Sequence, residues 1–408
     1  MRLNWLAVAA PSHHLLLVFP AANSPVVALQ THPLTPGLKG VSDLSYAGSH
    51  PVSRLSTADP AVMAAGVKSA ELFAFSTYKV NDMAASARPM ASFTFAVATD
   101  ASWPADGTVE FMMNLPTAIE PDMIRRGTPL GPAASAASAS DCLRSCNGNA
   151  ACMSWNFDRA AGTCTLQRDA PNMFYALGTD CGLRGAWTYD STGSCLTLTR
   201  PGAGGSNGGM SLCASTATSD SSAAFGTYDG GGGAFVDLEG GKGLNSDLDS
   251  AHGAVVVTAK VPPASNATLT ITFGWHFPER DHFGKTFGNF YKNLFVDSAD
   301  AAFGPLAAGA PRTAALAAVV TDILAMQTPF HGSSLEPWLQ DHLVNSLSHI
   351  RTAMWFDSCP NCHKTNDTRS PGFWRQWEAF DCPDLDSIHN DGERHIPYIM
   401  FWPSTEIA

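Results

Sequence analysis

Two groups of segments in this chain alternate apolar and polar residues with a period of two. The first group contains residues 73–78 (Phe-Ala-Phe-Ser-Thr-Tyr) and 91–98, and the second contains residues 254–261 and 267–275. Aromatic and β-branched residues at alternate positions are typical of half-buried strands. Because clusters of turn-forming residues separate the segments, the pattern predicts a β-sandwich built from both groups.

The period changes to that of a helix in the last quarter of the chain. Apolar residues recur at spacings of three and four over Thr313–Met326 and Leu335–Trp355, which predicts two amphipathic helices. Ser333 and Glu336 have the spacing of a capping box at the start of the second helix. A third helix is predicted from Tyr398 to Trp402.

Seven cysteines fall between Cys142 and Cys213, and two low-complexity stretches, 131–140 and 202–209, flank most of them. Dense, irregularly spaced cysteines favour a disulfide-stapled module over a metal site, and Gly/Ala/Ser-rich stretches favour linkers. We therefore expect an inserted module at 132–213. It would separate the first part of the sandwich (1–131) from its second part with a linker (214–300), and a further domain would begin at 301 and run to 408.

Composition and charge limit the binding partners and the cellular location that the sequence predicts. A formal net charge of −12 without clustered Lys or Arg argues against nucleic acid. No stretch is long and apolar enough to predict a transmembrane span. The segment Leu6–Phe19 faintly resembles a signal peptide, although Pro11 interrupts it; alternatively, the chain begins partway through a domain. The cysteines and the sequons at Asn266 and Asn366 favour the secretory pathway or an extracellular location.

The first cysteines carry a family resemblance. The pattern Cys142-x3-Cys146-x5-Cys152-x2-Trp155-x-Phe157, followed by Cys164-Thr-Leu, resembles a PAN/apple domain. The resemblance implies a helix stapled to a small sheet by bridges from Cys142, Cys146, Cys152 and Cys164, with an exposed face that binds glycan or protein. Four cysteines allow three connectivities, so spacing leaves the pairing open.

A second resemblance depends on the order of several segments. These are residues 48–55, 71–78, 274–278 (Gly-Trp-His-Phe-Pro), 288–295, 300–302 and 337–347. Together they resemble the N-terminal part of family-116 glycoside hydrolases, the non-lysosomal glucosylceramidase family. The resemblance implies an α+β multidomain fold in which the sandwich, with its inserted PAN/apple-like module, precedes the first helices of a truncated (α/α)6 toroid. It also implies that membrane association is possible.

Within this resemblance Glu378 aligns with the catalytic nucleophile of a retaining β-glycosidase acting on a β-glycoside or glycolipid. Trp377 would pack against the sugar, and Asp386, His389 and Asp391 would bind it; the family has an Asp where this chain has His389. The general acid/base of the family lies downstream of this segment, so we expect this polypeptide to be inactive or incomplete.

The alternative is a non-catalytic protein that binds glycan or protein through the sandwich and the PAN-like module. The motif Cys359-Pro-Asn-Cys362-His363 matches a haem-attachment pattern, but a local disulfide or free thiols is favoured because no apolar pocket sequence lies nearby and no axial Met partner is evident. Metal binding by the same group with Cys382 is disfavoured because a second CxxC motif is missing. The sequence predicts no metal and no cofactor.

Overall fold

The computed structural model describes most of the chain between residues 44 and 347 and a few short segments outside it. The described ranges are 15–18, 27–28, 39–40, 44–49, 51–58, 60–80, 82–115, 119–120, 122–170, 173–189, 194–201, 207–215, 221–228, 241, 243–246, 252–282, 285–304, 312–347, 354–357, 373–376 and 399–400.

The larger sheet of the molecule has eight antiparallel strands. In spatial order these are β16 (Ala186–Tyr189), β17 (Cys195–Pro201), β18 (Asn207–Ser215), β21 (Asn266–His276), β7 (Met90–Thr99), β6 (Val67–Ser76), β5 (Val52–Thr57) and β4 (Leu44–Ser49). The predicted strands at 73–78, 91–98 and 267–275 correspond to β6, β7 and β21.

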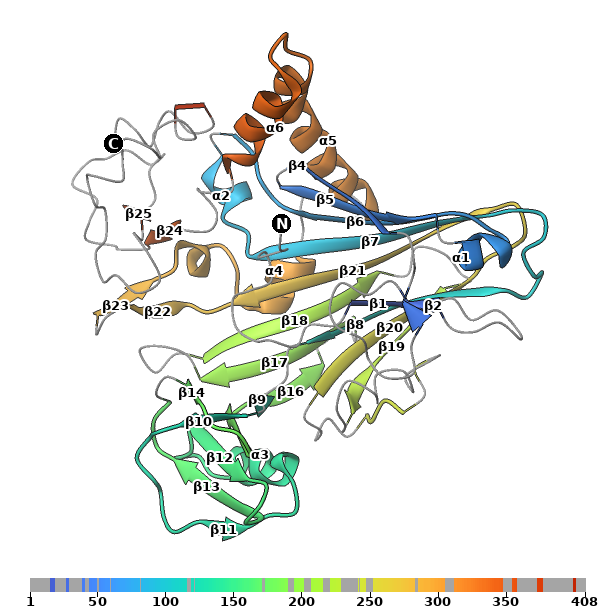
Figure 1. Ribbon diagram of the computed structural model, residues 1–408. Coiled ribbons are helices and arrows are strands. Elements are labelled where there is room, and N and C mark those ends of the chain that lie inside the picture. The colour runs from blue at the N-terminus through green and yellow to red at the C-terminus, as the bar shows by residue number, and fades with distance from the viewer. Residues whose placement is uncertain are drawn as a thin grey trace.

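A six-stranded sheet faces the larger one (Figure 1). Its spatial order is β19 (Ser221–Tyr228), β20 (His252–Lys260), β8 (Thr108–Leu115), β1 (Leu15–Val18), β2 (Val27–Ala28) and β3 (Lys39–Gly40). The segment predicted at 254–261 lies largely in β20. All of these pairs are antiparallel except β2 with β3, which are parallel.

The main hydrophobic core lies between these two sheets. Residues 109–115 of β8 are all buried, and alternate ones, among them Phe111 and Leu115, join a cluster with Phe95 of β7 and Ile271 of β21. The rings of Phe95 and Phe111 lie 6.2 Å apart, centroid to centroid. Alternation along each strand therefore directs one face inward, and the predicted sandwich is confirmed.

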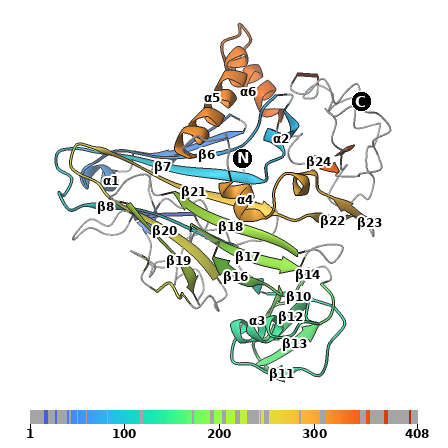
Figure 2. The ribbon, with the colours of Figure 1, turned by 180° about the vertical axis from the view of Figure 1, so that it is seen from behind.

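Two helices cover part of the outer face of the larger sheet (Figures 1 and 2). Leu316 and Ile323 of α5 (Arg312–His331) pack against Val52, Phe75 and Met90 of β5–β7. The short α4 (Ser298–Phe303) packs against β18 and β21. The remaining short elements are α1 (Pro60–Ala64), α2 (Met83–Ser86), the 3₁₀ helix η4 (Phe290–Asn293), and the hairpin of β22 (Glu279–His282) and β23 (Lys285–Gly288).

The second predicted helix is shorter than expected. α6 spans Pro337–Asn345, and residues 354–357 form a strand, β24 (Met354–Asp357), paired with β25 (Phe373–Gln376). Glu336 is the N-cap of α6 and its side chain makes no capping bond, so the predicted capping box is wrong. Proline suits the first helical position because it lacks an N–H, and Pro337 therefore starts the helix after Glu336 rather than after Ser333.

The toroid stays a prediction, because beyond Leu347 the structure describes only three short segments. Residues 399–400, inside the third predicted helix, are helical. Within the described residues, no helix is both long and apolar enough to cross a membrane.

A small separate unit, here called the inserted module (residues 119–185), lies at one end of the two-sheet sandwich (Figure 1). Its sheet has the order β11 (Ala134–Ser135), β13 (Thr163–Gln167), β12 (Ser154–Asp158), β15 (Thr179–Leu183) and β9 (Ile119–Glu120). It also contains α3 (Ala139–Asn147) and a ribbon of β10 (Met123–Arg125) and β14 (Met173–Tyr175).

These limits differ from the predicted range of 132–213. Strands β16–β18 belong to the eight-stranded sheet, and β17 and β18 are joined there by the Cys195–Cys213 disulfide. The low-complexity stretches are not simple linkers either. Residues 131–140 supply β11 and the start of α3, and Gly208 and Gly209 lie in β18. A small residue fits at 208 because a Cβ on Gly208 would meet the ring of Phe277.

Candidate functional site

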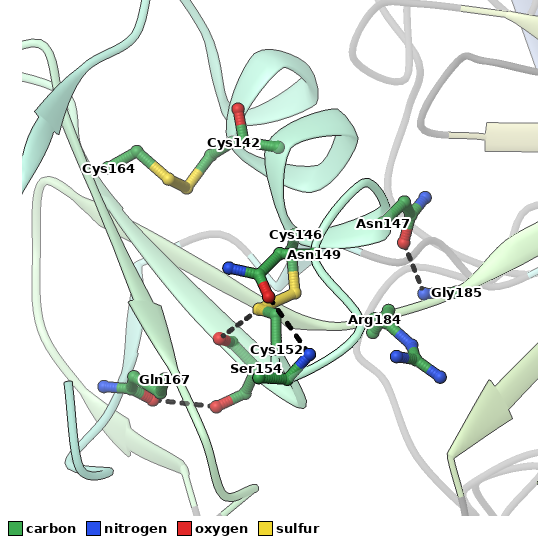
Figure 3. The surroundings of a disulfide bond; sticks show 12 residues. Cys142, Cys146, Asn147, Asn149, Cys152, Ser154, Cys164, Gln167, Arg184 and Gly185 are labelled. Carbon is green, nitrogen blue, oxygen red and sulfur yellow. Dashed lines mark hydrogen bonds between the residues drawn. A yellow bond between two sulfur atoms is a disulfide. The ribbon is translucent and has the colours of Figure 1, made fainter. Parts of the chain in front are cut away.

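The inserted module is organised around α3 and two disulfides (Figure 3). Cys142 bridges to Cys164 on β13, and Cys146 bridges to Cys152 just before β12. Ser138 caps the helix by accepting a hydrogen bond from the Asp141 N–H at 3.1 Å. The four cysteines pack around the fully buried Trp155. Two bridges and one large aromatic side chain thus provide the core that so small a unit needs.

A buried polar network attaches the β10–β14 ribbon to the module sheet. Asn156 of β12 accepts a hydrogen bond from the Arg125 N–H at 2.9 Å and donates one to the Arg125 carbonyl at 2.7 Å. Gln167 of β13 donates to the same carbonyl at 2.7 Å and accepts from the Ser154 hydroxyl at 2.8 Å. On the edge of β10 that faces away from β14, these side chains therefore bond the backbone as a partner strand would.

Two carboxylates beside the ribbon share one guanidinium. Arg159 forms an ion pair with Asp122 and a second with Asp180, the latter at 3.1 Å. Asp122 has a positive φ of 56°, which Asp tolerates better than most residues. Its Oδ1 also accepts the Gly178 N–H at 3.0 Å. The cluster thus holds the segment that follows β14 against the start of β10.

The two carboxyl groups differ in acidity. The hydrogen bond from the Gly178 N–H lowers the pKa of Asp122, and Arg159 acts in the same direction. Burial raises the pKa of Asp180, while the charge of Arg159 opposes that rise. Asp180 is therefore largely enclosed, whereas the Asp122 side chain retains 34% of its exposure. Of the two, Asp122 is the one open to a ligand.

Large apolar side chains are exposed on the same ribbon. Phe174 is 48% exposed, Tyr175 is 74% exposed, and Leu177 just beyond the strand is 77% exposed. The Arg126 guanidinium lies over the Phe174 ring, 5.2 Å from its centroid. Ala176, the neighbour of Tyr175, donates its N–H to the Asp122 carbonyl at 2.9 Å. The ribbon therefore exposes two aromatic rings, a cation and a carboxylate. Phe174 and Tyr175 are consecutive in β14, so their rings lie on opposite faces of the ribbon. We call Asp122, Arg126, Phe174 and Tyr175 the ribbon surface.

The structure places the sequence-predicted residues very unequally. The candidate cysteines Cys142, Cys146, Cys152 and Cys164 lie together in the inserted module and form its two disulfides. The proposed nucleophile Glu378, its neighbour Trp377, and the sugar-binding candidates Asp386, His389 and Asp391 all lie outside the described residues. The motif at 359–363 lies outside them as well. Among the residues that the structure describes, no cluster of three or more His, Cys, Asp or Glu side chains could hold a metal ion.

Two segments that carry the glycoside-hydrolase resemblance do meet in the fold. Phe277 follows β21, and Asn289 and Tyr291 begin the aromatic run after β23. The Tyr291 hydroxyl donates to the Phe277 carbonyl at 2.9 Å, and the Asn289 amide donates to the same oxygen at 2.7 Å. These contacts hold a corner beside the sandwich.

Sequence reasoning missed the ribbon surface. Phe174 and Tyr175 lie in a strand of three residues, which is too short to show a period. Asp122 and Arg159 are 37 positions apart, so only the folded chain brings their charges together. The one signal in the sequence is the aromatic pair itself in an otherwise polar, Gly- and Asp-containing stretch.

The architecture of the inserted module is that of a small, disulfide-stapled domain with one helix on a twisted antiparallel sheet. Comparison with protein families agrees with this assignment, since residues 124–185 match the model of the PAN domain. This part of the chain is a PAN domain. It is well under half of the sequence, and the match does not extend to the sandwich or the C-terminal region.

Other comparisons add little beyond this domain. No curated protein matches the chain. Among solved structures, the chain is similar to TgMIC4-A5 in a complex with lacto-N-biose, with 24% sequence identity and a TM-score of 0.15. The match covers 15% of this chain and 90% of that one. Neither the PAN-domain match nor this similarity supports the resemblance to family-116 glycoside hydrolases.

Proposed function

We propose that this chain is a secreted glycan-binding protein and that the ribbon surface of its PAN domain is the binding site. The observation that carries the proposal is the exposure of Phe174 and Tyr175 on the two faces of a ribbon that begins next to the partly open Asp122 carboxylate. Aromatic faces pack against the apolar C–H faces of a sugar ring, and a carboxylate accepts hydrogen bonds from neighbouring hydroxyls. The disulfides are consistent with an extracellular setting.

Rigidity of the site supports the same proposal. Arg126 restrains the Phe174 ring, and the Arg159 ion pairs restrain Asp122. A site whose side chains are already ordered loses less conformational entropy when a ligand binds. The acidic chain carries a net charge of −12, so neutral glycans are expected to bind better than sulfated or sialylated ones.

The test is glycan-array binding with the disulfide-intact full chain, followed by calorimetry with the best ligand; lacto-N-biose is included as one probe. Tyr175→Ala should weaken affinity about tenfold or more, because an exposed aromatic anchor of this kind contributes more than about 1.4 kcal/mol. The matched control is Trp338→Ala on α6, which removes another aromatic residue that is 69% exposed. Unchanged affinity in a Phe174→Ala, Tyr175→Ala double variant, or an array without any retained glycan, would overturn the proposal.

Retaining β-glycosidase activity through Glu378 is a separate proposal that rests on the sequence resemblance alone. Trp377, Asp386, His389 and Asp391 would bind the sugar there. A mechanism-based epoxide inhibitor should label Glu378 if the proposal is correct, and Glu378→Gln should abolish the label. Labelling at another residue would disprove this proposal.

A further inference from the structure

Asn266 is the first residue of β21 and begins the sequence Asn266-Ala-Thr268. Side chains alternate along a strand, so Asn266 and Thr268 share one face. Both are exposed, while the intervening Ala267 packs against the core and Leu269 is 2% exposed within it. The acceptor amide and the hydroxyl that an N-glycosylation sequon requires therefore both face outward.

The outer face of the larger sheet is open at this end. α5 packs on it near Phe75 and Met90, and α4 packs on it near Gly274. At the end where β21 begins, Thr268 lies opposite Ala96 of β7, which is also exposed. Among the described residues, neither α4 nor α5 packs there, and Asn266, Thr268 and Ala96 are exposed on this face.

Within the described residues, β21 is paired on one side only over the same positions. The ladder with β18 begins at Thr270, which pairs with Ser215, whereas the ladder with β7 runs from Asn266. A strand segment that is paired on one side only can pair with another chain unless it is covered.

The turn before Asn266 holds the sequon in place. Ala264 has a φ of 52° and donates its N–H to the Asp100 carbonyl at 2.8 Å. The Ser265 carbonyl accepts the Thr99 N–H at 2.8 Å. The backbone on the N-terminal side of Asn266 is therefore fixed by two hydrogen bonds, and its side chain projects from a tight turn.

We propose that Asn266 is an N-glycosylation site whose glycan covers this open end of the sheet. The donor is a polyprenyl-diphosphate-linked oligosaccharide. The Asn266 amide nitrogen forms a bond to the anomeric carbon of the donor's reducing-end sugar, the bond from that carbon to the diphosphate oxygen breaks, and the amide loses one proton. The reaction belongs to the oxidising compartment in which disulfides such as the three among the described residues form.

The test uses the full chain secreted from cultured eukaryotic cells, with Asn366→Gln as the background so that the second sequon does not contribute. Recovery from the medium shows that the protein has passed through the glycosylating compartment. Treatment with an amidase that removes N-glycans should increase gel mobility and convert Asn266 to Asp, which peptide mass spectrometry detects. Thr268→Ser should retain the glycan, and Thr268→Ala should lose it.

The Thr268→Ala variant removes the recognition hydroxyl without altering the acceptor, and Asn266→Gln is the second, independent variant. Circular dichroism establishes that each secreted variant is folded. The variants without the glycan should associate at lower protein concentration than the Thr268→Ser protein. Secreted protein with unmodified Asn266 would overturn the proposal.

Discussion

The side chain of Asn156 makes two hydrogen bonds to the backbone of one residue, Arg125, accepting from its N–H at 2.9 Å and donating to its carbonyl at 2.7 Å. This is the pattern of two antiparallel strand residues, made here by an amide side chain. It attaches the ribbon with the exposed aromatic residues to the disulfide-stapled sheet.

Asn156→Ala should destabilise the PAN domain by about 2 kcal/mol. The substitution leaves the Arg125 N–H without this acceptor in a residue that is 9% exposed, and a buried unsatisfied group costs about 1–3 kcal/mol. Chemical denaturation monitored by a probe on the domain measures the change. Asn149→Ala, which removes a single local bond to the Ala151 N–H, is the control and should cost less. Equal losses of stability in the two variants would show that the hydrogen bonds of Asn156 contribute no more than the single local bond of Asn149.

The two disulfides of the PAN domain should contribute unequally to its free energy of unfolding. Cys142 and Cys164 are separated by 22 positions, and Cys146 and Cys152 by 6. Closing the longer loop restricts the unfolded chain more, so the loop-entropy relation gives about 3 kcal/mol for the first bridge and about 2 kcal/mol for the second. Paired Cys→Ser variants, compared by denaturation, test the order. The reverse order would mean that native packing, rather than chain entropy, decides their contributions.

The sequence predicts the framework of the fold better than its binding surface. Period-two segments identify β6, β7, β20 and β21 because each has a buried face and is eight residues or longer. The cysteine pattern identifies the PAN domain through its family resemblance, and the helix and sheet that the resemblance implies are present as α3 and the sheet around β12.

The sequence-based predictions that were wrong or missing have identifiable physical causes. Residues 131–140 have linker composition, yet Ser138 is a helix cap and Ala134–Ser135 pair with β13; composition does not distinguish a linker from a short edge strand. Ser333 and Glu336 match a capping box, but Pro337 places the helix start later. The partners of Arg159 come from distant parts of the chain, and such contacts have no local signature.

Acidification should destabilise the corner beside β21 through His276. The side chain is 6% exposed, and burial lowers its pKa below the usual 6.5, although Asp297 and Asp300 act in the opposite direction. A histidine with a lowered folded-state pKa stays neutral in the fold while the unfolded chain takes up a proton. Stability is therefore full above about pH 6.5 and falls as the pH decreases below it.

Imidazole NMR titration measures the His276 pKa directly, and denaturation at a series of pH values measures the linked stability. His276→Gln should reduce the slope of stability against pH below 6.5. A His276 pKa above 6.5 would contradict the prediction.

Substitutions at Asp122 should separate its backbone role from its side-chain role. The residue has a φ of 56°, which Asn adopts readily, Gly adopts without steric cost, and Ala adopts poorly. Its Oδ1 accepts the Gly178 N–H and pairs with Arg159. Asp122→Asn keeps an acceptor oxygen and a compatible backbone, Asp122→Gly keeps only the backbone, and Asp122→Ala keeps neither.

Thermal stability of the PAN domain should therefore decrease in the order Asn, Gly, Ala, as thermal unfolding of the full chain measures. An Ala variant as stable as the Gly variant would show that the positive φ does not limit stability. If the ribbon surface binds glycan as proposed, glycan affinity should follow a different order, with Asn closest to the native residue and Gly and Ala both poor, because the proposed contact uses the side-chain oxygen and not the backbone.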